Sequence, residues 1–206
     1  MARGYFYPPG LIYDGLLEPV LRSIRKKVRE LIIKHDLFPV LDLCCGPGAQ
    51  LPYLAGQGRL ACGSDINLPM LKYAAGRRKK IPFVCADAAD TPFRPAAFKG
   101  IILSFSLHEK EAPLRPRLIA EAKRLLMPEG RIVLVDFETP WNRASRRASL
   151  YIWVIERLAG NEHFRHGREF LAAGGLRALL RENGLEELDR RHVSAGTCAV
   201  VLAAPR

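Results

Sequence analysis

The sequence predicts an α/β protein with a doubly wound sheet of seven strands, mostly parallel, with one antiparallel strand in a C-terminal hairpin. Short apolar runs alternate with segments whose apolar residues recur at helical spacing, which is typical of parallel strands joined by crossover helices. The last two runs are separated only by a short turn at Ala195 and Gly196, so they should pair antiparallel. The 206 residues suffice for one domain, and we expect residues 1–206 to form a single one.

The first half of the chain is expected to supply a helical segment and four strands. Residues 1–36 form an N-terminal helical segment, because apolar residues return at helical spacing from position 14 onward. A short helix is predicted near 49–56, and a longer one at 67–78, which Asn67 can cap. The strands are predicted at residues 39–45, 59–65, 81–87 and 98–106.

The second half completes the sheet. A helix at 116–127 should stop at the Pro-Glu-Gly sequence that follows it, before a fifth strand at 131–137. A further helix at 167–184 is expected to end at Gly184. Strands at 185–194 and 197–205 form the predicted hairpin.

Residues 141–170 are predicted to be a cap-like helical insertion, which either packs on the sheet or covers a ligand pocket. As a plain structural helix, the segment would only pack its apolar side on the sheet. As a cap, its arginines would recognise a carboxylate or phosphate and allow weak contact with an anionic membrane. Its apolar face would comprise Tyr151, Ile152, Val154, Ile155 and Leu158, and its basic face Arg143, Arg146, Arg147 and Arg157.

Composition and charge leave several kinds of partner open. The chain carries 32 Lys and Arg against 21 Asp and Glu, a net charge of +11. This balance suits nucleic acid, an anionic membrane surface or an acidic substrate, but also an ordinary arginine-rich surface. The five cysteines show no C-x-x-C spacing and no zinc pattern, so we expect no metal site and a reducing compartment. No apolar stretch has the length of a signal-peptide core or a membrane span, and a cytoplasmic protein is therefore expected.

Three aspartates end successive predicted strands. Asp42 precedes a turn that contains Gly46 and Gly48, while Asp65 and Asp87 end the second and third strands. Because the carboxyl ends of parallel strands share one edge, these carboxylates should converge beside a backbone that a ligand can approach closely. The second acid can accept hydrogen bonds from ribose hydroxyls and the third from an adenine amine. Asp42 would repel a pyrophosphate and suits a cationic ligand, so the pattern predicts a positively charged nucleoside.

The motifs also resemble those of one enzyme family. VLDLCCGPG, GSDINLPML, CADAADTPF and FKGIILSFSLHE resemble, in this order, the first four motifs of the class I S-adenosylmethionine-dependent methyltransferases. The resemblance covers residues 37–204 and is strongest to the group with the ubiquinone and menaquinone C-methyltransferases. It implies a Rossmann-like fold, S-adenosylmethionine as cofactor, and methyl transfer to a small, lipophilic or aromatic molecule. Two residues depart from the pattern: Cys44 replaces a frequent glycine, and Lys99 replaces a common acid.

The resemblance also assigns roles at the cofactor site. Asp42 and the first-strand turn would hold the methionine portion, and the second acid would hold the ribose with its neighbour Ile66 against the adenine face. The third acid and the backbone of the next residue would bind the adenine, and the carbonyl of Ser104 in the fourth strand would bind the ammonium. The residues that match these positions are Asp42, Cys44, Gly46, Gly48, Asp65, Ile66, Asp87, Ala88 and Ser104.

Catalysis by such an enzyme depends mostly on positioning, because the sulfonium is already activated. Where a proton must be removed, His108 is the predicted base, with Glu109 beside it as the other candidate. Glu138 and Trp141 follow the fifth strand and are candidates to line the acceptor pocket. No comparable placement is evident for His35, His163, His166 and His192.

Three other functions remain open at this point. A nicotinamide dehydrogenase is disfavoured by the missing third glycine and by Asp42. An RNA methyltransferase suits the basic charge, but the motifs for methylating base amines or cytosine carbon are missing. A non-catalytic S-adenosylmethionine-binding protein would keep the same motifs. The acceptor, the methylated atom and the oligomeric state have no motif in this sequence.

Overall fold

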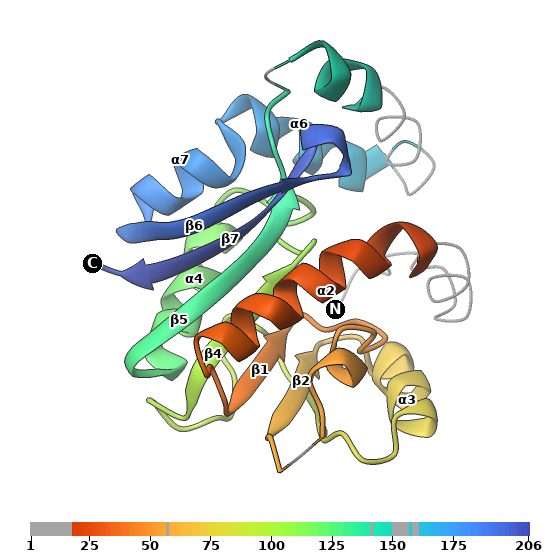
Figure 1. The fold of residues 1–206 in the computed structure, drawn as a ribbon, viewed down its shortest axis with the longest axis vertical. Helices are drawn as coiled ribbons and strands as arrows, with labels where there is room; N and C mark the ends of the chain where they lie inside the picture. The colour runs from red at the N-terminus through yellow and green to blue at the C-terminus, as the bar shows by residue number, and fades with distance from the viewer. Residues whose placement is uncertain (1–17, 57, 141, 150–156, 158–160) are drawn as a thin grey trace.

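A seven-stranded sheet lies at the centre of the protein (Figure 1). The computed structural model describes residues 18–56, 58–140, 142–149, 157 and 161–206. The strand order is β3-β2-β1-β4-β5-β7-β6, and β7 runs antiparallel to both of its neighbours while the other pairs are parallel. The predicted fold class is therefore confirmed. The strands are β1 (Val40–Leu43), β2 (Ala61–Asp65), β3 (Phe83–Cys85), β4 (Phe98–Ser104), β5 (Leu126–Phe137), β6 (Leu185–Val193) and β7 (Cys198–Pro205).

Helices cover both faces of this sheet. Helices α2 (Glu18–Lys34) and α3 (Leu68–Arg77) lie in front of it in Figure 1, and α4 (Leu114–Leu125) and α7 (Gly175–Glu182) lie behind, with α6 (Asn161–Ala172) beside α7. Successive side chains of a strand point to opposite faces. Leu41 and Leu43 accordingly belong to the core under α4 and α7, whereas Val40 belongs to the core under α2. Asp42 shares the face of Val40, so its carboxylate points toward α2.

Local structure differs from the prediction in three segments. The helix predicted near 49–56 is only a 3₁₀ turn, η2 (Leu51–Tyr53), because Gly56 adopts a positive φ of 124° and the chain turns away. The helix predicted at 116–127 ends at Leu125, since β5 already pairs with β4 at Leu126. The helix predicted at 167–184 is two helices, because Gly174 and Gly175 have φ of 102° and 59° and break the path between α6 and α7.

The predicted N-terminal segment and cap are described only in part. Residues 1–17, Trp141 and the proposed apolar face at 151–155 and 158 lie outside the described residues. Residues 143–149 are helical, and Asn142 caps them, its Oδ1 accepting a hydrogen bond of 2.7 Å from the Ser145 amide. The arginines of this turn, Arg143, Arg146 and Arg147, are exposed.

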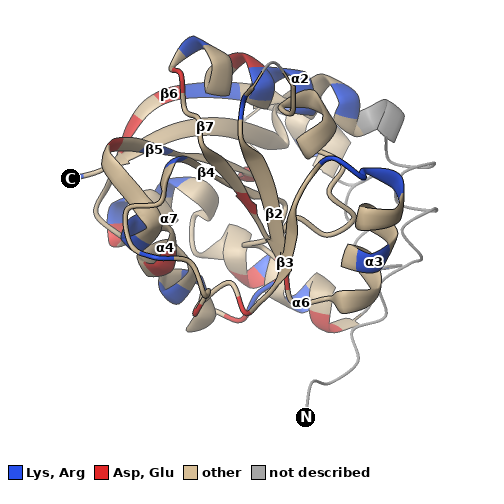
Figure 2. Ribbon diagram, turned by 90° about the horizontal axis from the view of Figure 1, so that it is seen from below, with Lys and Arg blue, Asp and Glu red and all other residues tan. Residues whose placement is uncertain are grey.

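The positive charge is spread over several elements. Figure 2 shows Lys and Arg on α2, on α3 and on the loop after α3, with acidic residues among the basic ones near α4 and α7. This distribution suits the ordinary basic surface that the composition left open. None of the described helices is long and apolar enough to cross a lipid bilayer.

Candidate functional site

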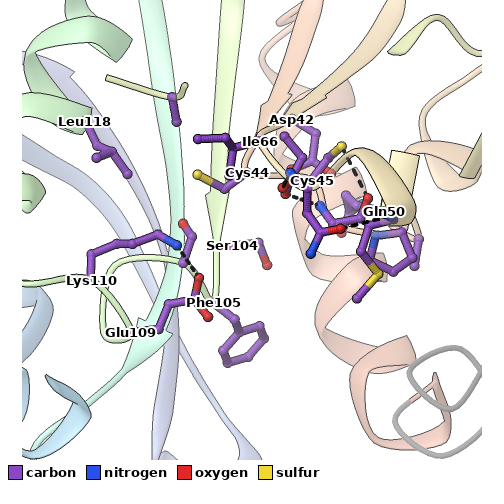
Figure 3. Close-up of a pocket in the computed structure, with 18 of the residues that line it drawn as sticks. Asp42, Cys44, Cys45, Gln50, Ile66, Ser104, Phe105, Glu109, Lys110 and Leu118 are labelled. Carbon is purple, nitrogen blue, oxygen red and sulfur yellow. Dashed lines mark hydrogen bonds and ion pairs between the residues drawn. The ribbon is translucent and has the colours of Figure 1, made fainter. Parts of the chain in front are cut away.

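A cavity of about 280 Å³ opens beside the carboxyl ends of β1, β2, β3 and β4 (Figure 3). Helix α2 contributes one wall and α4 another. Of the residues predicted to bind the cofactor, all except Gly48 line it: Asp42, Cys44, Gly46, Asp65, Ile66, Asp87, Ala88 and Ser104. Residues from four separate strand ends thus meet in one cavity, as expected at the switch point of a doubly wound sheet.

Asp42 is a buried acid in the wall of this cavity. Its side chain is on the α2 face of β1, and the residue is only 3 % exposed. Burial, together with the nearby Asp65 carboxylate, raises the pKa of Asp42 to about 7, and the charge of Arg25 on α2 opposes this rise. The carboxyl of Asp42 can therefore gain or lose a proton near neutral pH, and a cation placed beside it favours the ionised form.

Asp65 connects the end of β2 to the first-strand turn. Its Oδ2 accepts a hydrogen bond of 2.7 Å from the Gly46 amide, and its Oδ1 accepts one of 2.8 Å from the Asn67 amide. Burial raises the pKa of Asp65, and these two hydrogen bonds oppose that rise. Each carboxylate oxygen has a second lone pair, so both can still accept from a vicinal diol.

The end of β3 supplies a more exposed part of the cavity. Asp87 is exposed, and its Oδ1 accepts a hydrogen bond of 2.9 Å from the Ala89 amide. Ile66 lines the same cavity and has 65 % of its surface exposed, which is unusual for a large apolar residue. The combination offers an apolar surface next to hydrogen-bond acceptors, which suits a flat heteroaromatic ring.

The turn after β1 explains the glycine pattern. Cys44, which stands where glycine is frequent, adopts a left-handed φ of 65°, a conformation that costs a non-glycine residue about 1 kcal/mol. Burial raises the pKa of the Cys44 thiol to about 12, so it stays neutral in the cavity wall. Gly48 lies outside the lining. Its φ is 70°, and a Cβ at this position would lie 2.7 Å from Cε1 of the Phe83 ring.

The loop after β4 forms the opposite wall (Figure 3). Phe105 adopts a φ of 51° and its amide donates a hydrogen bond of 2.7 Å to the Val135 carbonyl, which turns the chain into the cavity. The Ser106 hydroxyl is buried there and has no hydrogen-bond partner among the described residues, so it is available to a ligand. Lys110 Nζ lies 2.6 Å from Glu109 Oε1, and both residues line the cavity.

His108 lies behind this wall rather than in it. The residue is 3 % exposed, and its Nδ1 is 2.7 Å from Asp136 Oδ1. Asp136 also accepts hydrogen bonds from the amides of Leu107, His108 and Phe137. The pair therefore attaches the β4–α4 loop to the end of β5, and the predicted role of His108 as a base stays a prediction.

Two histidines to which the sequence analysis assigned no role lie beside this loop. His163 Nδ1 is 3.6 Å from Glu109 Oε2, and the His163 ring meets the His108 ring edge-on at a centroid distance of 5.2 Å. His166 Nδ1 is 3.0 Å from the Glu109 carbonyl oxygen. The spacing of three residues on an amphipathic helix places both histidines on one face, and this signal could have revealed them.

Two further residues are placed differently from their sequence pattern. Glu138, a candidate for the acceptor pocket, is buried in an ion pair with Arg190 of β6. Arg25 lines the cavity from α2, although no motif marks it. Among the described residues, no three His, Cys, Asp or Glu side chains gather in a geometry that could hold a metal ion.

Comparison with known proteins identifies the family of this chain. A family model described as a methyltransferase domain matches residues 40–130. A demethylmenaquinone methyltransferase of Clavibacter sepedonicus is 30% identical over 177 residues, which are 78% of this chain and 71% of that protein. A protein of the same name from Mycolicibacterium vanbaalenii is 34% identical over 125 residues, 59% of this chain and 52% of its own length. The chain spans about half the length of most of these curated relatives.

Solved structures share the fold. A SAM-dependent methyltransferase from Aquifex aeolicus aligns with a TM-score of 0.64 at 18% identity, covering 96% of this chain and 98% of that one. The N-methyltransferase NodS from Bradyrhizobium japonicum, in complex with S-adenosyl-L-homocysteine, aligns with a TM-score of 0.64 at 15% identity over 90% and 87% of the two chains. The fold and the ordered strand-end acids define a class I S-adenosylmethionine-dependent methyltransferase, and this chain belongs to that family. Within the family it is similar to the demethylmenaquinone methyltransferases.

The cavity suits the cofactor of this family. S-adenosylmethionine carries ribose hydroxyls, an adenine amine, an ammonium and a sulfonium, all of which favour acceptors or negative charge. The lining supplies the carboxylates of Asp42, Asp65 and Asp87, and the unpartnered Ser106 hydroxyl offers a further hydrogen bond. The residues present therefore fit the group.

Proposed function

We propose that this protein transfers a methyl group from S-adenosylmethionine to a small lipophilic aromatic acceptor of the hydroquinone type. The observation that carries the proposal is the meeting of three strand-end carboxylates, Asp42, Asp65 and Asp87, in one cavity beside an exposed apolar surface at Ile66. The acceptor class is supported by the similarity to proteins named demethylmenaquinone methyltransferase. A cytoplasmic setting is supported by the five thiols in the sequence, which suit a reducing compartment.

The chain's own residues would bind and orient the reactants. Asp65 receives the ribose hydroxyls, Ile66 contacts one face of the adenine, and Asp87 accepts from its amine. Asp42 and the turn around Gly46 hold the methionine portion, and the Ser104 carbonyl accepts from its ammonium. When bound, the cofactor supplies an electrophilic methyl group with a neutral thioether as leaving group. Positioning then contributes most of the rate acceleration.

Methylation of an aromatic carbon also requires removal of a ring or hydroxyl proton. Glu109 lines the cavity on the side of the β4–α4 loop, and its second oxygen faces His163 at 3.6 Å. A proton accepted by Glu109 can pass to the imidazole and from there to solvent, since the His163 side chain is 22% exposed. We propose Glu109 with His163 as this proton acceptor, and His108 as the residue that positions their loop.

The acceptor would enter from the side of residues 141–170. The exposed arginines of the helical turn 143–149 lie at the start of this segment, where they can meet an anionic headgroup or a negatively charged acceptor. Phe105 lines the cavity, and its ring centroid is 6.0 Å from that of Phe137, so the pair supplies aromatic surface. We propose that the segment covers a lipophilic acceptor and contacts anionic membrane weakly.

Transfer of an isotope-labelled methyl group tests the function. The purified chain is incubated with S-adenosylmethionine carrying a deuterated methyl group and with a reduced naphthoquinone that lacks one ring methyl, and the product is analysed by mass spectrometry. A labelled product that depends on the protein is expected, together with S-adenosylhomocysteine. The Asp65→Ala variant serves as the cofactor control. Tight cofactor binding without any methylated product from a panel of phenolic, quinol and RNA acceptors would instead indicate a non-catalytic binding protein.

A further inference from the structure

We propose that the ammonium of Lys110 binds the hydroxyl oxygen of the aromatic acceptor and stabilises its phenolate during methyl transfer, an inference that rests on the function proposed above. Lys110 lies in the β4–α4 loop, lines the cavity, and has a side chain that is 21% exposed. Its Nζ is 2.6 Å from Oε1 of Glu109, the residue proposed above as the proton acceptor. A hydroxyl that gives its proton to Glu109 therefore leaves its negative oxygen next to a cation.

The backbone of the loop holds Lys110 in this position. The Lys110 amide donates a hydrogen bond of 3.2 Å to the Leu107 carbonyl oxygen. The amides of Leu107 and His108 in turn donate to the Asp136 carboxylate at 3.0 Å and 3.2 Å, which attaches the loop to the end of β5. The side chain of Lys110 therefore starts from a fixed turn, and a charge positioned in advance is what makes the stabilisation of an oxyanion effective.

The wall around Lys110 suits a flat lipophilic ring. Leu114 and Leu118 are four residues apart on α4 and both line the cavity, as does Phe105 just after β4. Figure 3 shows Lys110 and Leu118 on the side of the cavity opposite Asp42. An apolar wall that contains an ammonium matches an aromatic acceptor with an ionisable hydroxyl.

The charge of Lys110 also acts on the two parts of the cofactor site that flank the reactive methyl group. Burial raises the pKa of Asp65, at the proposed ribose position, and the charge of Lys110 opposes this rise. Burial likewise raises the pKa of the Cys44 thiol, in the turn proposed for the methionine portion, and Lys110 opposes that rise as well. The sulfonium of S-adenosylmethionine joins the ribose to the methionine portion, so a charge that acts on both positions lies on the side of the methyl group. An anionic oxygen between Lys110 and the sulfonium is attracted by both.

The proposed step conserves atoms and charge. The O–H bond of the acceptor breaks, its proton goes to Glu109, and the electron pair stays on the oxygen, where Lys110 stabilises it. An ammonium has three N–H donors, so Lys110 can bind this oxygen and the Glu109 carboxyl together. The electron-rich ring carbon next to the oxygen takes the methyl group, its hydrogen leaves as a proton, and the oxygen regains a proton. Overall, one methyl group replaces one ring proton.

A coloured phenol measures this stabilisation without any methyl transfer. A nitrated naphthol, whose phenolate absorbs at longer wavelength than the neutral phenol, is bound to the protein in the presence of S-adenosylhomocysteine, at a pH near the pKa of the probe in water. We expect the ratio of bound phenolate to bound phenol to be about tenfold to a hundredfold lower in Lys110→Met than in the native protein, the loss typical of one charge-assisted hydrogen bond. With the reduced naphthoquinone as acceptor, the turnover of Lys110→Met should fall by about a hundredfold or more.

Three further variants separate charge from structure. Lys110→Arg keeps the charge and should keep most of the phenolate. Lys72→Met makes the same chemical change at an exposed position of α3, and it should leave the ratio unchanged. Glu109→Gln removes the carboxylate that competes for Lys110, so it should raise the phenolate ratio although it lowers turnover. If Lys110→Met does not fold by circular dichroism, Lys110→Gln makes the same comparison.

The outcomes distinguish this inference from the proposed function. Native protein that binds no S-adenosylhomocysteine and yields no methylated product would contradict the function itself. A methylated product together with equal phenolate ratios in the native protein and Lys110→Met would overturn the inference and leave the function intact. Weaker binding of S-adenosylmethionine by Lys110→Met with an unchanged phenolate ratio would also overturn it, because the ammonium would then serve the cofactor.

Discussion

Binding of S-adenosylmethionine should release a proton from Asp42 near pH 6. Burial and Asp65 raise the pKa of Asp42 to about 7, so at pH 6 roughly nine in ten of these carboxyls are protonated in the free protein. A cation about 6 Å from the carboxylate, at an effective dielectric constant of about 20, lowers its pKa by about two units. At pH 6 binding should then release about 0.8 proton, and the affinity should rise about fortyfold between pH 5 and pH 8.

Calorimetric titrations in two buffers with different ionisation enthalpies measure this proton release directly. Asp65, whose pKa burial also raises, and Arg25 are the nearby charged groups, and both remain in the Asp42→Asn variant. That variant should release much less proton at pH 6 and show a flatter affinity profile. Release of less than about 0.2 proton by the native protein at pH 6 would refute the reasoning. Equal proton release by the Asp42→Asn variant and the native protein would also refute it.

The same pKa determines how stability depends on pH without cofactor. The folded protein holds the Asp42 proton more tightly than the unfolded chain, in which the pKa has its ordinary value of 3.8. The contribution of Asp42 to the free energy of unfolding is therefore highest below pH 4 and decreases as pH rises toward 7. In urea titrations at several pH values, Asp42→Asn should gain stability relative to the native protein across this range.

Three further predictions concern single substitutions. Asp136→Ala removes the acceptor of three backbone amides and of His108, so it should lower the free energy of unfolding by about 3–5 kcal/mol in urea titrations. Asp189 is partly exposed, and the control Asp189→Ala should cost less than about 1 kcal/mol. Gly48→Ala places a Cβ against the Phe83 ring at a positive φ, so it should lower the free energy of unfolding by about 1–3 kcal/mol in the same titrations. The folded variant should keep its cofactor affinity. Asp65→Ala should weaken cofactor binding about tenfold to a hundredfold by calorimetry, and an unchanged affinity would place the ribose elsewhere.

The succession of strands along the chain and the acids that end them could be predicted from the sequence because both depend on local pattern. Apolar runs such as that of residues 98–106 are too short for helices, and the brief turn at Ala195 permits only an antiparallel return. Once the strands are parallel, residues that end them must share an edge. The cavity at Asp42, Asp65 and Asp87 follows from that rule alone.

Helix limits were less predictable, because pairing and backbone conformation decide them. Leu126 has a helical neighbourhood in sequence, yet it pairs with Phe98 and starts β5. Gly174 and Gly175 are tolerated in a helical pattern, but their positive φ values separate α6 from α7. The energies that decide such points come from contacts with distant residues, which a local pattern does not contain.

By itself, then, the sequence determined the fold class and the acidic strand ends, since strand period and the succession of strands along the chain need no knowledge of packing. Only the tertiary structure decided which other side chains face the cavity. Arg25 enters it because α2 crosses the sheet face on which Asp42 lies, and His163 meets Glu109 because α6 packs against the β4–α4 loop. Gly48 leaves it because Phe83 occupies the space beside the turn. These placements depend on how elements far apart in the chain pack together, and such contacts leave no periodic signal in the sequence.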